Sequence, residues 1–98
     1  MTKLMNSINT RIKYILNNSD NAYLENQCRI INLKLDELKE REYEDEMTVK
    51  FICNNIISGN INKMKRVSGQ TNMVYKKMDE LAEFIEQLKT VYFEGEEE

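Results

Sequence analysis

The sequence predicts an all-α protein of coiled-coil type: a short N-terminal helix, then a long antiparallel helical hairpin with its turn near Gly59. The chain of 98 residues has no proline and only 3 glycines, and 32% of its residues are charged, mostly as Glu and Lys. This composition is typical of long helices rather than of sheets. Apolar residues also repeat at helical spacing along most of the chain.

The first segment, residues 1–18, predicts a short amphipathic helix. Its apolar residues follow one another in steps of four, four and three, as one face of a helix requires, at Leu4, Ile8, Ile12 and Ile15. The polar run 17–21 then gathers residues that favour turns, and Ser19 or Asp20 is suited to cap a following helix. The boundary to the hairpin, residues 19–93, is therefore expected there.

Two heptads of apolar residues follow. The first runs through Leu24, Cys28, Ile31, Leu35 and Leu38, is interrupted by Glu42 and Asp45, and resumes at Val49, Ile52 and Ile56. The second runs through Cys53, Ile57, Asn60, Met64, Val67 and Thr71 and ends in the apolar residues Val74, Met78, Leu81, Ile85, Leu88 and Tyr92. Because the two heptads are one position out of phase, we expect the helix to break where they overlap.

The break is predicted at Gly59, which lies between Ser58 and Asn60 and costs helix stability. A turn there leaves two helical arms of nearly equal length, 24–57 and 61–92, which suits a hairpin. Gly69 is the competing position for the break, and the acidic segment around Glu42 is a third. The last residues, 94–98, are expected to form a disordered acidic tail.

A chain of this length buries little surface on its own, so we expect it to be oligomeric. The interaction surface is predicted on the two apolar stripes. Its residues are Leu24, Ile31, Leu35, Leu38, Val74, Met78, Leu81, Ile85, Leu88 and Tyr92. The expected partners are other helical chains, either copies of this one or different proteins.

Charge is unevenly distributed along the chain. The segment 47–78 carries six Lys or Arg and no acidic residue, although the net charge of the chain is -3. A turn at Gly59 would gather part of this segment into a basic tip that contacts an acidic partner. The residues of that tip are Lys50, Lys63, Lys65 and Arg66. The alternative function is therefore a small helical nucleic-acid-binding or regulatory protein of viral or phage type that uses segment 47–78.

Catalysis is not expected. The chain has no His, which removes the commonest general base and metal ligand. Its 2 Cys, Cys28 and Cys53, form no Cys-x-x-Cys pair and are expected to pack in a core. No glycine-rich phosphate loop and no calcium loop occurs. We therefore expect neither a cofactor nor a metal.

The sequence contains no apolar run long enough to cross a bilayer and no signal-peptide pattern. A soluble, intracellular protein is expected, in the cytoplasm or the nucleus. Taken together, these patterns predict a non-catalytic interaction subunit or adaptor of a larger complex.

Overall fold

The computed structural model describes residues 2–40 and 45–94, and in these ranges it is helical apart from short connections, with no strand. The predicted all-α class is confirmed. Three helices are continuous: α1 (Thr2–Asn18), α2 (Ala22–Lys39) and α5 (Asn72–Glu94). Between α2 and α5 stands a third rod, in which α3 (Glu46–Phe51), the π-helix η1 (Ile52–Ile57) and α4 (Ser58–Lys65) follow one another without a gap.

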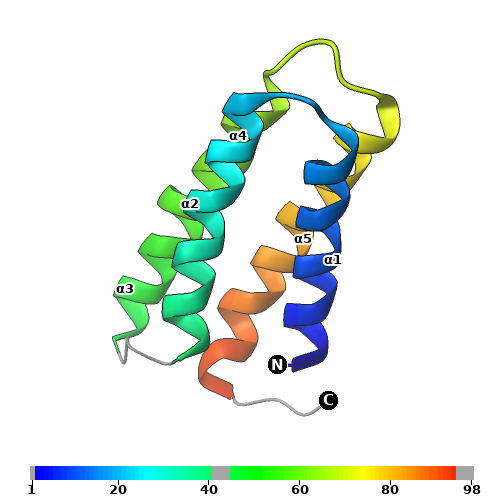
Figure 1. The fold of residues 1–98 in the computed structure, drawn as a ribbon. Coiled ribbons are helices and arrows are strands. Elements are labelled where there is room, and N and C mark those ends of the chain that lie inside the picture. The colour runs from blue at the N-terminus through cyan, green and yellow to red at the C-terminus, as the bar shows by residue number, and fades with distance from the viewer. Residues whose placement is uncertain (1, 41–44, 95–98) are drawn as a thin grey trace.

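The four rods alternate in direction and form an up-down-up-down bundle (Figure 1). α1 packs chiefly against α5, and α2 packs against the third rod. The third rod also contacts α5, and α1 contacts α2, so α1 and the third rod lie at opposite corners. The principal extents are 39 × 24 × 17 Å. Each rod therefore turns one face to a common core.

Side chains cap three of the helices where the chain changes direction. The Leu24 amide donates to the Asn21 side chain (3.0 Å) and begins α2. The Thr48 amide donates to the Asp45 carboxylate (3.1 Å), and the Val74 amide donates to Thr71 Oγ1 (3.2 Å). These bonds use backbone amides that have no partner within the first turn of a helix.

The predicted cap of α2 was one residue or more too early. Asn21 is the N-cap, while the Ser19 hydroxyl donates back to the Ile15 carbonyl. Ser19 therefore closes the end of α1 instead of beginning α2. Asp20 is exposed between the two helices.

The turn predicted at Gly59 was wrong. Gly59 lies inside α4, and the chain reverses over residues 66–71 instead, where Gly69 has a φ of 85°. Such a positive φ favours glycine, so Gly69, the competing position, suits this turn. A second interruption separates Lys39, the last residue of α2, from Asp45, while Glu42 itself lies outside the described residues.

The π-helix η1 explains why no turn is needed at Gly59. The Ser58 amide donates to the Cys53 carbonyl, five residues earlier, so this turn takes in one more residue than an α-helical turn. The extra residue absorbs the one-position phase difference between the two heptads. The buried stripe passes from Val49 and Ile52 to Cys53 and Ile57 within one continuous rod.

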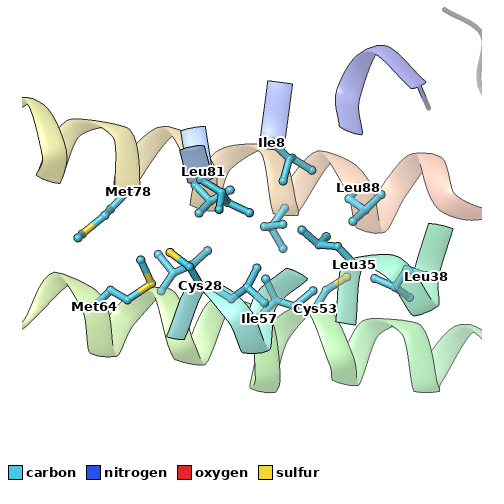
Figure 2. Close-up of a cluster of buried hydrophobic side chains, with 14 of the residues drawn as sticks. Ile8, Cys28, Leu35, Leu38, Cys53, Ile57, Met64, Met78, Leu81 and Leu88 are labelled. Carbon is cyan, nitrogen blue, oxygen red and sulfur yellow. The ribbon is translucent and has the colours of Figure 1, made fainter. Parts of the chain in front are cut away.

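One apolar core joins all four rods (Figure 2). α1 contributes buried residues at every third or fourth position, and so do α2 and α5. In Figure 2, Ile8 from α1 points towards the same space as Leu81 from α5, Cys28 from α2 and Ile57 from η1. Burial of one such side chain stabilises the fold by about 1.5–3 kcal/mol. The bundle therefore holds together through apolar contacts within a single chain.

Candidate interaction surface

The ten residues predicted to form an interaction surface lie in the core of the chain itself. Those from α2 and α5 are between 0% and 3% exposed. They are Leu24, Ile31, Leu35 and Leu38 from α2, and Val74, Met78, Leu81, Ile85, Leu88 and Tyr92 from α5. In this fold their apolar side chains are already covered, so none is exposed to a second chain.

The four basic residues do not gather at one tip. The end of α4 carries Lys63, Lys65 and Arg66. Lys50 lies earlier in the same rod, in α3, at a distance of about 20 Å along the helix axis at 1.5 Å per residue. The expected cluster required a turn at Gly59, which the continuous rod excludes. Two of these cations also have carboxylate partners within the chain: Lys50 pairs with Glu46 (3.0 Å) and Lys65 with Asp79 (2.6 Å).

Large apolar side chains are exposed on the outside of the bundle instead. Met47 is 79% exposed, Leu33 58% and Phe51 55%. Met47 and Phe51 stand one helical turn apart in α3, on the side opposite the buried Val49. We call this pair the α3 surface. Tyr23, Met73 and Phe93 are exposed to a smaller extent.

A groove between α3 and α5 adjoins the α3 surface. Its lining residues are Glu46, Lys50, Glu86, Lys89, Thr90 and Phe93. Lys89 pairs with Glu86 (2.8 Å) and donates to Asn54 Oδ1 (2.6 Å), which ties α5 to the third rod. The charges in this groove are thus satisfied within the chain, and the exposed apolar atoms of Phe93 remain available.

A second groove lies along α2, beside the end of α1. Its lining residues are Leu16, Asn17, Glu25, Arg29, Asn32, Leu33 and Asp36. We call it the α2 groove. It differs from the first groove because its exposed leucine, Leu33, is flanked on both sides by charged residues of the same helix.

A polar cluster between α1 and α5 stabilises the bundle. Arg11 pairs with Glu80 (3.1 Å) and lies over the Phe84 ring, 4.9 Å from its centroid. Lys77 also pairs with Glu80 (3.3 Å) and lies 5.7 Å from the centroid of the Tyr14 ring. The hydrogen bond from Arg11, followed by that from Lys77, lowers the pKa of the Glu80 carboxyl below its usual value.

The two cysteine thiols have low reactivity. Cys28 and Cys53 are free and buried, and burial raises the pKa of each thiol to about 11. In residues 2–40 and 45–94, no three Cys, Asp or Glu side chains come together as a metal-binding group. No helix in the same ranges is long and apolar enough to cross a membrane.

The chain matches no protein family model, no curated protein and no solved structure. Its function must therefore be argued from its own surfaces. The sequence patterns did not single out Leu33, Met47 or Phe51. Their signal is indirect: each is a large apolar residue that lies off the heptad positions of its helix.

Proposed function

We propose that the chain is a non-catalytic interaction module, an adaptor or complex subunit, that binds another helical protein through the α3 surface. The observation that carries the proposal is the exposure of Met47 (79%) and Phe51 (55%) on one face of α3. The bundle core is complete without them, so their exposure does nothing for the stability of the isolated chain.

Two apolar side chains one turn apart are the kind of anchor that one helix offers to a groove in another helical protein. Burial of a Met or Phe side chain contributes about 1.5–3 kcal/mol, which makes such a pair a useful anchor. Phe93 of α5 lines the groove beside α3, together with Glu46 and Lys50. The partner is therefore expected to present an apolar groove or an amphipathic helix.

The chemistry of the chain supports a non-catalytic role. It has no His, and its two buried thiols, with pKa values of about 11, stay protonated near neutral pH. Free, buried cysteines also fit a reducing compartment inside the cell.

The alternative, a nucleic-acid-binding protein that uses segment 47–78, has less support. Lys50 and Lys65 pair with carboxylates of the chain, and Lys50 lies far from Lys63 and Arg66. A phosphate backbone is best contacted by cations that share one face.

The proposal is tested by substitution of both anchors, Met47→Ser with Phe51→Ser, in the tagged full chain produced in its native cells. The matched control is Met73→Ser, which removes an exposed Met from α5 instead. Helix content and thermal melting should be alike in all variants, because exposed substitutions change stability by only about 0.5 kcal/mol. A partner protein should co-purify stoichiometrically with the wild type and the control but not with the double variant. Equal recovery with all three, or no stoichiometric partner with any, would refute the assignment.

A further inference from the structure

Charged residues along the α2 groove alternate in sign around an apolar centre. Glu25, Arg29 and Asp36 line the groove, with Leu33 between the second and the third, and Lys39 follows beyond the groove near the end of α2. Arg29 and Asp36 stand seven residues apart, on the same face of the helix. Their midpoint falls between Asn32 and Leu33.

These charges have no carboxylate or cationic partner within the described part of the chain. No ion pair there involves Glu25, Asp36 or Lys39. Arg29 donates only to the Asn26 side chain (3.2 Å). On another face of the same helix, in contrast, Lys34 pairs with Glu37 (3.4 Å). Within α2, the charges without an ion pair thus lie on the face that carries the exposed Leu33.

We propose that the α2 groove binds the α2 groove of a second copy of this chain, in an antiparallel dimer with twofold symmetry. With the axis between Asn32 and Leu33, Arg29 of each copy faces Asp36 of the other. Glu25 of each copy then comes level with Glu40 of the other and within one residue of Lys39. The two Leu33 side chains meet at the axis, with Leu16 beside them. Arg29 and Asp36 of each copy thereby find opposite charges in the other copy.

The pattern favours a second copy over other occupants because it is complementary to itself only in this orientation. A parallel pairing of α2 helices would place Arg29 against Arg29 and Asp36 against Asp36. Twofold contacts of this kind are the commonest route to protein dimers. Exposed ion pairs add little affinity, so they set the alignment, while burial of Leu33 supplies the attraction. A weak dimer that dissociates further in high salt is expected.

This dimer uses a different surface from the α3 surface, so either proposal can fail without the other. Sedimentation equilibrium of the untagged full chain at low salt should show a monomer–dimer equilibrium across micromolar concentrations. Arg29→Glu alone or Asp36→Arg alone should raise the dimer Kd at least about tenfold, which corresponds to about 1.4 kcal/mol. Met47→Ser is the control on the α3 surface and should leave the Kd unchanged.

The decisive sample is an equimolar mixture of the two single variants. In the mixed dimer, Glu at position 29 of one copy faces Arg at position 36 of the other, and the native Asp36 faces the native Arg29. The mixture should therefore dimerise about as strongly as the wild type, although neither variant does so alone. A wild type that stays monomeric, a dimer that neither reversal weakens, or a mixture that stays monomeric would each overturn the proposal. Circular dichroism verifies that each variant is folded.

Discussion

Deletion of Asn55 should leave the bundle folded and about as stable as the wild type, although it removes a residue from the middle of a packed helix. Asn55 is exposed in η1, and its side chain is not part of the core. The deletion shortens the π-helical turn by the one residue that distinguishes it from an α-helical turn. The third rod should then become a regular α-helix.

The spacing of the buried residues gives the expected magnitude. Ile57, Ile61 and Met64 follow Val49 by 8, 12 and 15 positions, which in a regular helix would place them about 60–120° away from Val49 around the helix axis. After the deletion these spacings become 7, 11 and 14, which is the regular helical repeat. All four residues stay buried without a π-helix. We therefore expect a change of less than about 1 kcal/mol in the free energy of unfolding, at the level of ordinary surface changes.

The control is deletion of Glu83, an exposed residue of α5, where no π-helical turn can absorb the loss. That deletion rotates Ile85, Leu88 and Tyr92 away from the core by about 100°. Loss of a buried large side chain costs about 2–5 kcal/mol, so three such losses exceed the stability of most small domains. Urea unfolding followed by circular dichroism measures both variants. Similar destabilisation by the two deletions would refute the role assigned to η1.

Two further changes test the turn and the polar cluster. Gly59→Ala should stabilise the chain by about 0.5–1 kcal/mol, because Gly59 is helical and an added Cβ meets nothing within 4 Å. Gly69→Ala should destabilise it by about 1–2 kcal/mol, because its φ is 85°; equal thermal shifts for the two glycines would contradict the observed turn. The pKa of Glu80 is lowered from 4.5 by Arg11, so this pair stabilises the fold above the unfolded pKa and the stabilisation is lost as the pH falls through the folded pKa. Glu80→Gln should therefore show a shallower loss of stability on acidification below about pH 5 than the wild type, and parallel curves would show that Glu80 does not contribute.

The buried face of each helix could be predicted from the sequence because it depends only on the spacing of apolar residues. Ile8, Ile12 and Ile15 on α1 are buried, and so are Leu81 and Leu88 on α5. The same apolar stripe must be buried whichever element covers it, so its position can be predicted from the spacing alone.

The position of the turn could not be predicted from the same pattern. The heptad that contains Ile52 and the heptad that contains Ile57 are one position out of phase. This difference is consistent with a chain reversal or with a π-helical turn, and the sequence Ser58-Gly59-Asn60 favours the reversal. Packing of α4 against both α2 and α5 favours the continuous rod. These contacts join elements that are distant in sequence, so they cannot be predicted from the helix propensity of the local residues.

The candidate surface was harder to predict for a related reason. Periodicity shows which face of α2 is buried but not which chain buries it, so Leu35 and Leu38 fit a surface for a partner chain as well as they fit a contact with the third rod. Leu33 and Met47 lie off the heptads, where an apolar residue carries no periodic signal. Only the folded bundle distinguishes their outward faces from the core.

The pairing of α1 with α5 also affects how the chain acquires its structure during synthesis. Arg11 and Glu80, which join these helices, are separated by 69 positions. Contacts between such distant residues require closure of a long loop and form late. α1 thus leaves the ribosome before its partner α5, and its apolar face is exposed in the meantime. A product released before α5 is complete leaves the main partner of α1 missing, so premature termination should give an aggregation-prone fragment rather than a smaller stable bundle.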